Sequence, residues 1–154
     1  MIRRAEERDI PELLRLLRQI SMVHHRGRPD LFKYGTKYSE ADLKVIIADE
    51  SRPIFVDADE AGRAAGYAFC ILKQAVDDPI LTDIRTLYID DLCVDEALRG
   101  RQIGRGLLEH VKAYARDIGC YNLTLNVWCM DGSALGFYEK CGLKPQKVGM
   151  EVVV

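Results

Sequence analysis

Two segments of the chain carry side chains suited to proton transfer. The segment 88–94, YIDDLCV, holds the adjacent carboxylates Asp90 and Asp91, and the segment 133–142, SALGFYEKCG, holds Tyr138. A carboxylate can accept a proton from a reacting group, whereas a phenol with a pKa of about 10 is protonated at neutral pH and can donate one. The alternatives are structural: carboxylates bonded to nearby backbone, and a tyrosine packed in the core.

The two carboxylates lie in the stretch 83–94, whose β-branched and aromatic residues predict a strand. Side chains alternate across a strand, so Asp90 and Asp91 should face opposite sides of the sheet unless a bulge intervenes. On that alternation Asp90 shares its face with Leu92 and Val94.

A turn rich in glycine and arginine, RGRQIGRGLL at 99–108, joins this strand to the next predicted helix. It departs from both common phosphate-binding patterns. Arg105 follows Gly104 where the P-loop needs lysine, and Glu109 replaces the third glycine of the dinucleotide pattern. The helix start still offers free backbone N–H groups and a favourable dipole beside three arginines. The turn therefore indicates either a diphosphate site or a solvated end of a loop.

The elements that position these residues form one predicted domain over residues 1–154. Asp9 with Pro11 predicts the start of a helix that reaches about Val23, and Ser39 with Asp42 predicts a capping box for a second helix. The other expected elements are a hairpin at 54–58 and 64–75, strands at 83–94, 121–128 and 146–154, and helices at 103–119 and 133–142. The order is β-α-α-β-β-β-α-β-α-β, with a right-handed crossover that makes the sheet mixed.

Two motifs together resemble the GCN5-related N-acetyltransferase (GNAT) superfamily. They are VDEALRG at 94–100, which precedes the Leu-Leu helix start, and ALGFYEKCG at 134–142. The resemblance extends from about Thr82 to Pro145. It implies an α/β (α+β) fold with a mixed central sheet of about six to seven strands flanked by about four helices.

The resemblance also implies acetyl-coenzyme A as cofactor, with the strand before the turn pairing with its pantetheine arm and the turn holding its pyrophosphate. Aligned on the helix start, the pyrophosphate loop is 99–104, although a literal R-x-x-G-x-G string lies at 101–106. Gln102 stands where the family usually has glycine, and Asp131 where many relatives have asparagine. The implied cofactor-binding residues are Leu92, Cys93, Val94, Arg99, Gly100, Arg101, Gln102, Ile103, Gly104, Asn126 and Asp131.

For catalysis, the resemblance implies that Tyr138 donates a proton to the departing thiolate and that Asp90 acts as base, through water. The acidic pair resembles that of the polyamine and glucosamine-phosphate acetyltransferase branches. Neither Cys93 nor Cys129 has a histidine placed beside it, which favours direct transfer without an acetyl-enzyme. The expected substrate-binding residues are Asp91, Tyr88 and Phe32.

The acceptor expected is a primary amine of a small molecule. The loop 24–38 supplies histidines and arginines that would suit an acidic acceptor, whereas the aspartates near the strand would suit a cationic one. These two signals conflict and leave the acceptor open. A non-catalytic acyl-CoA-binding module and a protein or peptide N-acetyltransferase are the alternative functions.

The composition argues against nucleic acid, membranes and metal ions as partners. The net charge of −2 gives no basic excess for nucleic acid or an anionic membrane, and no apolar run approaches the roughly 20 residues that span a bilayer. The five cysteines form no CxxC pair and no metal-ligand spacing with the three histidines, so we expect buried thiols, no metal and a cytoplasmic location. The terminal MEVVV could pair as an edge strand in a homodimer.

Overall fold

Four α-helices and five strands make up the chain in a computed structural model that describes all 154 residues. Two short 3-10 helices lie in connections between these elements: η1 (Glu7–Asp9) before the first α-helix and η2 (Glu96–Leu98) before the third. In chain order the elements are β1 (Ile2–Arg4), α1 (Ile10–Gly27), α2 (Glu40–Ile47), β2 (Ile54–Ala58), β3 (Ala64–Gln74), β4 (Arg85–Val94), α3 (Ile103–Asp117), β5 (Asn122–Leu125) and α4 (Ser133–Lys140). The predicted order is confirmed as far as α4.

The helix starts follow the local signals in the sequence. Pro11 lies in the first turn of α1, where its missing N–H is harmless. Asp9 precedes α1 but makes no capping bond to it, because its carboxylate accepts from Arg3 and from the Glu6 N–H instead. The helix also runs to Gly27, beyond the predicted end near Val23. At α2 the Ser39 hydroxyl accepts from the Asp42 N–H at 3.1 Å, while the Asp42 carboxylate accepts from the Ser39 N–H at 2.9 Å. This is the predicted capping box, and it fixes where the loop after α1 re-enters helix.

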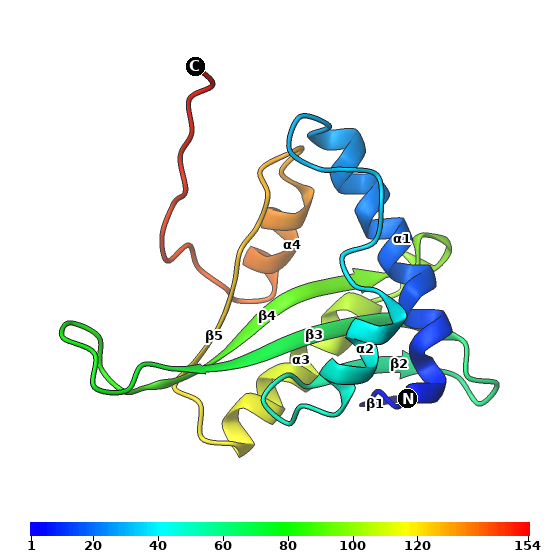
Figure 1. Ribbon diagram of the computed structural model, residues 1–154, viewed down its shortest axis with the longest axis horizontal. Helices are drawn as coiled ribbons and strands as arrows, with labels where there is room; N and C mark the ends of the chain where they lie inside the picture. Colours follow the sequence, from blue (N-terminus) through cyan, green and yellow to red (C-terminus); the bar gives the residue numbers. More distant parts are fainter.

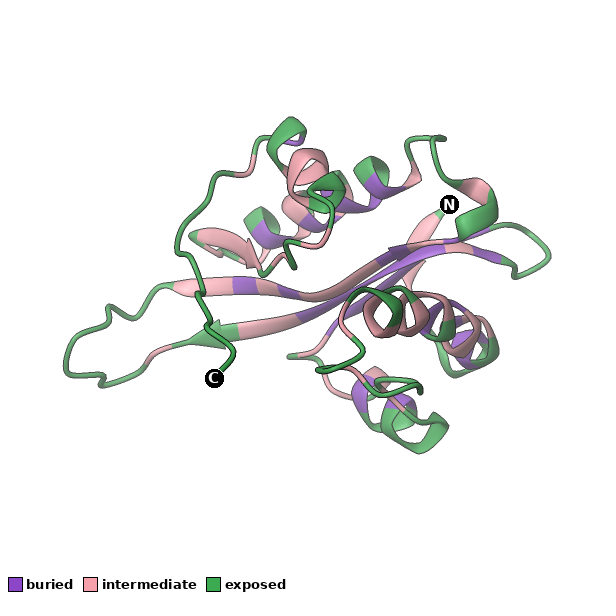
Figure 2. Cartoon of the chain, turned by 90° about the horizontal axis from the view of Figure 1, so that it is seen from above, coloured by how far each residue is buried: buried purple, intermediate pink, exposed green.

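The sheet has the strand order β1-β2-β3-β4-β5 and lies between two helical layers (Figures 1 and 2). The first three pairs are antiparallel, whereas β4 and β5 are parallel and are connected by α3. The layer of α1 and α2 covers one face, with Leu13, Leu17 and Tyr67 buried between them and the sheet. The layer of α3 covers the other face, where Leu87 and Leu108 are buried. No helix combines the length and apolarity needed to cross a bilayer.

The expected sheet of six to seven strands is wrong for this chain, because only five strands form. β5 is shorter than the strand predicted at 121–128, and residues 146–154 are not a strand. That terminal segment leaves the body of the molecule (Figure 1). Its strand-like composition has no neighbouring strand to pair with, and a strand exists only as part of a ladder.

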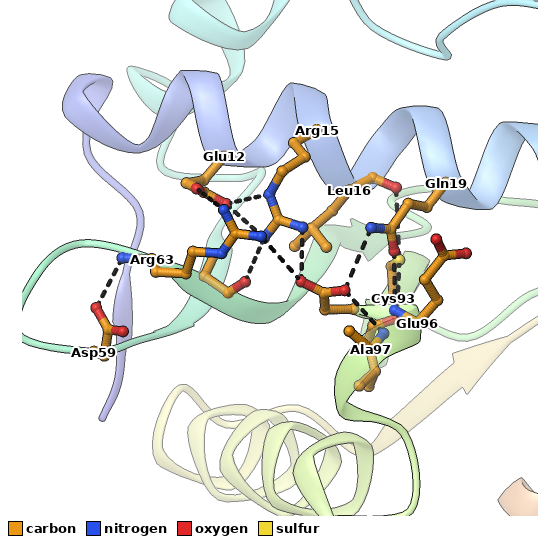
Figure 3. A network of polar contacts seen from close by, with 12 residues as sticks. Glu12, Arg15, Leu16, Gln19, Asp59, Arg63, Cys93, Glu96 and Ala97 are labelled. Carbon is orange, nitrogen blue, oxygen red and sulfur yellow. Dashed lines mark hydrogen bonds and ion pairs between the residues drawn. The ribbon is translucent and has the colours of Figure 1, made fainter.

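A polar network ties α1 to the chain just after β4 (Figure 3). Asp95 is buried, with 3% of its surface exposed, and accepts from Arg15 at 2.7 Å and from the Ala97 N–H at 3.1 Å. Arg15 also donates to the Ala64 carbonyl at 2.8 Å, and Gln19 accepts from the Glu96 N–H at 3.0 Å. The network therefore fixes the point at which the chain leaves β4 toward the glycine-rich turn.

We expect Asp95→Asn to lower the free energy of unfolding at pH 7 by about 1–3 kcal/mol, because it removes the buried one of the two carboxylates that pair with Arg15. Urea denaturation measures this difference. Burial raises the pKa of Asp95. The hydrogen bonds from the Ala97 N–H, Arg15 and Gln19 together lower this pKa by more, so the net shift is downward. The stabilisation is then present above the unfolded pKa of about 4 and is lost as the pH falls below it.

The matched control is Asp117→Asn, since Asp117 is exposed at the end of α3. This variant should stay within about 0.5 kcal/mol of the parent. Equal effects of the two substitutions would contradict the proposed role of the Asp95 network.

Candidate active site

A β-bulge at Asp90 interrupts the pairing of β4 with β3. Phe69 lies opposite Asp91, and the next residue of β3, Cys70, lies opposite Ile89. Asp90 is therefore an extra residue on β4, with no partner of its own across the ladder.

The bulge places both carboxylates on the face of the sheet that α1 and α2 cover. Asp90 accepts a hydrogen bond from Tyr38, and Asp91 accepts one from Tyr67 at 2.8 Å. Leu92 packs with the cluster on the opposite, α3 face. The expectation that Asp90 shares a face with Leu92 is wrong, because the inserted residue reverses the alternation that follows it.

The carboxylate of Asp90 is held from two sides by residues of the loop between α1 and α2. Lys37 Nζ lies 2.9 Å from Oδ1, and the Tyr38 hydroxyl donates to Oδ2. Arg52 Nη2 donates to the same hydroxyl at 3.3 Å. Burial, together with the hydrogen bond to Asp90 and its negative charge, raises the pKa of Tyr38, which keeps the phenol protonated as a donor.

Asp91 lies in a less polar environment than Asp90. Burial raises the pKa of Asp91 to about 6, although the hydrogen bond from Tyr67 and the charge of Lys37 act in the opposite direction. The charge of Asp90 raises it further. Asp91 is therefore a carboxylate whose protonation changes close to neutral pH.

Tyr138 projects from α4 and is half-buried. Burial, with the negative charge of Asp91, raises the pKa of Tyr138 to about 12. The phenol therefore holds its proton across the physiological range. Its ring packs with the cluster on the α3 face of the sheet.

The turn before α3 presents a row of free backbone donors. The N–H groups of residues 99 to 105 have no acceptor within the chain, because the first bonded N–H of the helix is that of Gly106, to the Gln102 carbonyl at 3.0 Å. The side chains of Arg99, Arg101 and Arg105 are exposed beside them. Free N–H groups, the helix dipole and guanidinium groups together make this turn suited to a diphosphate.

Two residues of this turn are constrained by backbone geometry. Gln102 has a φ of 64°, in the left-handed region that favours glycine, and it immediately precedes α3. Gly104 is buried, and a Cβ there would lie 3.2 Å from Phe137 and 3.4 Å from Val94. The turn is thus packed directly against α4, the helix that holds Tyr138.

β4 and β5 separate beside the turn. Their pairing ends at Ile89 and Leu125, whereas β4 continues to Val94. The edge of β4 over Leu92, Cys93 and Val94 therefore has no strand partner on this side. An unpaired edge of this kind can bond an extended ligand as another strand would.

Two expected cofactor residues beyond β5 have local partners. Asn126 donates to the Tyr88 hydroxyl at 3.2 Å, which links the end of β5 to β4. Asp131 accepts from the N–H and the hydroxyl of Ser133 at 2.9 and 2.7 Å, and so organises the start of α4. Those bonds lower the pKa of Asp131.

The loop after α1 contributes an aromatic wall near the end of β5. Phe32 stacks on His24 with ring centroids 4.9 Å apart and meets Trp128 edge-on at 5.1 Å. Burial and the charge of Lys37 lower the pKa of His24, which favours a neutral imidazole. Arg28 is bound to Asp30 and Glu151. His24 and Arg28, two of the groups that suggested an acidic acceptor, are thus neutral or already paired.

No motif in the sequence marks Lys37, Arg52 or Tyr67 as residues of this site. Lys37 lies in a loop without periodicity, and Tyr67 looks like an ordinary core residue of a strand. Only the pairing of β3 with β4 and the return of the loop to Asp90 bring them together. The one usable signal was the charge pattern, since two adjacent carboxylates on a buried strand need nearby donors.

The cysteines contribute no activated nucleophile. All five thiols are free, and burial raises the pKa of Cys93 to about 12. Cys129 is exposed, contrary to the expectation that all five are buried. No three His, Cys, Asp or Glu side chains come together in an arrangement suited to a metal ion.

Comparison with known proteins gives one matching family, the acetyltransferase (GNAT) family, over residues 17–143. A glucosamine 6-phosphate N-acetyltransferase from Oryza sativa subsp. japonica is 36% identical over 150 residues, covering 97% of this chain and 84% of that enzyme. The corresponding enzyme from Arabidopsis thaliana is 33% identical over 63 residues, which cover 41% of this chain and only 40% of that enzyme.

Solved structures show the same fold. A mutant of the BH1408 protein from Bacillus halodurans superimposes with a TM-score of 0.94 at 30% identity, covering 100% of this chain and 99% of that one. An aminoglycoside N-acetyltransferase solved with coenzyme A has a TM-score of 0.75 at 13% identity, with 100% and 98% covered. At that identity the likeness concerns the fold alone.

The left-handed conformation at Gln102 generates a stability prediction. We expect Gln102→Gly to be more stable than Gln102→Ala by about 1 kcal/mol, because alanine keeps the Cβ that disfavours this backbone conformation. Urea denaturation of the two variants measures the difference. An alanine variant as stable as the glycine variant would contradict the strain assigned to this position.

Proposed function

Because this chain belongs to the GNAT acetyltransferase family, we propose that it transfers an acetyl group from acetyl-coenzyme A directly to a primary amine of a small molecule. The observation that carries the proposal is the junction of β4, α3 and α4. There a row of free N–H groups lies between an unpaired strand edge and the helix that holds Tyr138.

The chain's donors fit the parts of coenzyme A. The free N–H groups of residues 99–105 and the adjacent arginines suit the pyrophosphate, and the open edge of β4 at Leu92–Val94 suits the amides of the pantetheine arm. Asn126 and Asp131 lie on the segment that follows β5, nearer α4. When bound, acetyl-coenzyme A supplies an activated acetyl thioester.

The residues of the site then divide the proton transfers between them. A protonated amine must lose a proton before it attacks, and Asp90 accepts that proton through water. Tyr138, protonated up to a pKa of about 12, donates to the departing sulfur. Asp91 binds the incoming ammonium. Direct transfer is favoured because Cys93 is a buried thiol and not a thiolate.

The acceptor is a small amine that fits between the aromatic wall and the acidic pair. Phe32, Trp128 and Tyr88 provide the apolar surface, and Asp91 provides the negative charge. The rice relative is a glucosamine 6-phosphate N-acetyltransferase, which supports a small molecule over a protein acceptor. The free thiols support a reducing, cytoplasmic setting.

A thiol-release assay over a panel of amino sugars, aminoglycosides, amino acids and peptides tests the activity. We expect Tyr138→Phe to lower kcat by about 100-fold while the affinity for coenzyme A, measured by calorimetry, stays unchanged, because the phenol acts only on the leaving sulfur. The matched control is Tyr121→Phe, since Tyr121 is exposed outside the site.

Three outcomes would count against the proposal. Failure to bind coenzyme A at millimolar concentration would remove the cofactor. Binding without turnover on any amine would favour a non-catalytic acyl-CoA-binding module. Unchanged kcat in Tyr138→Phe would remove Tyr138 as the acid.

We further propose that the terminal segment pairs with a second copy of the chain. Val148, Met150, Val152 and Val154 alternate along it and are at least 79% exposed. Such a row of apolar side chains on one face of an extended segment is typical of a strand that needs a sheet. The chain itself offers a matching site, because the outer edge of β5 has no strand partner. A two-fold axis would let each copy supply both the strand and the edge.

Sedimentation velocity measures this association. We expect the parent chain to be a dimer at micromolar concentration and Val152→Glu to weaken the dimer by about 100-fold or more, since it places a charge in an apolar strand face. The control is Val45→Glu, because Val45 is exposed on α2. A monomeric parent, or equal effects of both substitutions, would overturn the proposal.

A further inference from the structure

Lys37 occupies an unusual position for a surface lysine. Its Nζ lies 2.9 Å from Oδ1 of Asp90 and 3.4 Å from the Asp90 carbonyl oxygen. The lysine side chain is 43% exposed, whereas that of Asp90 is 14% exposed. The long lysine side chain therefore reaches from a solvent-accessible loop into the acidic pair.

This contact matters because of the role proposed for Asp90. A base that removes a proton from an acceptor amine must have that amine, or its water, within hydrogen-bond reach. Lys37 is itself a primary ammonium, and it already lies in direct contact with that carboxylate. The other oxygen of Asp90 is taken by Tyr38, so Lys37 holds the remaining position for a cation.

The acid of the proposed reaction, Tyr138, packs with the cluster on the α3 face of the sheet. Asp91 follows Asp90 at the bulge, and its charge contributes to the raised pKa of Tyr138. The charge of Lys37 in turn acts on Asp91. Lys37 contacts Asp90 directly, and Asp90 lies two residues before Leu92, where the open edge of β4 begins.

We propose that Lys37 is a self-acetylation site: in the absence of an acceptor, the chain transfers the acetyl group of acetyl-coenzyme A to Lys37 Nζ. This inference rests on the proposed function and assigns an amine of the chain itself as a substrate of the same site.

The chemistry balances without a further reactant. A C–N bond forms between Lys37 Nζ and the acetyl carbon, and the C–S bond of the thioester breaks. The ammonium gives one proton to Asp90, which releases it to water. The proton that the nitrogen loses on forming the amide restores the one that Tyr138 donates to sulfur. The product amide carries no charge and no longer forms an ion pair with Asp90.

The neighbouring lysines differ from Lys37 in their surroundings. Lys33 lies on the same loop and is exposed, with no ion pair or hydrogen bond to the rest of the chain. Lys44 pairs with Glu40 on the surface of α2. Only Lys37 contacts the acidic pair. Lys33 therefore serves as an internal reference for slow, uncatalysed acetylation by acetyl-coenzyme A.

The experiment incubates the full chain with acetyl-coenzyme A and no amine, and follows acetylation of each lysine by peptide mass spectrometry. We expect Lys37 to be modified at least about tenfold faster than Lys33, with a rate constant independent of protein concentration. Tyr138→Phe should slow Lys37 by about 100-fold and leave Lys33 unchanged, because only the catalysed reaction uses the phenol. Tyr121→Phe should change neither rate.

The inference is overturned if Lys37 is modified no faster than Lys33, or if Tyr138→Phe slows neither. The amine panel separates this failure from failure of the proposed function. If external amines are acetylated but Lys37 is not, the self-acetylation site is wrong and the function stands. If neither is acetylated, the proposed function fails with it.

Discussion

The single extra residue in β4 is the constraint on which the rest of the site depends. The bulge at Asp90 lies directly after Ile89, the last residue of β4 that pairs with β5. A bulge increases local twist and bends the strand, and here the two strands diverge from that point. The same residue therefore exposes the edge of β4 and turns two carboxylates toward one face. Without it, Asp91 would lie on the α3 side, away from Tyr67.

A second constraint couples the turn before α3 to α4. Gly104 lets the first turn of α3 pack against Phe137 and Val94, so the free N–H groups keep a fixed relation to Tyr138. The Asp95 network anchors the same turn from the side of α1. Between these two anchors the chain turns through a left-handed residue, Gln102. This conformation costs free energy in a residue that has a Cβ.

How far the sequence predicts this molecule depends on the range of the interactions involved. The capping box at Ser39 and the helix start at Pro11 are local signals, and the structure confirms both. The bulge at Asp90 depends on register with β3, and the contact of Lys37 depends on how an aperiodic loop returns to the sheet. The terminal segment has the composition of a strand, but it pairs with no strand of its own chain.

The adjacent carboxylates raise a question of charge that also bears on the acceptor. Two carboxylates turned toward one covered face repel each other and are poorly solvated, so each needs its own compensation. Lys37 contacts Asp90 directly, whereas the direct partner of Asp91 is the neutral hydroxyl of Tyr67, and the pKa of Asp91 is about 6. An ammonium brought by an acceptor would supply the missing positive charge to Asp91 and favour its ionised form. The bulge thus makes a site with one cation built into the chain and room for a second, which is an electrostatic preference for amines.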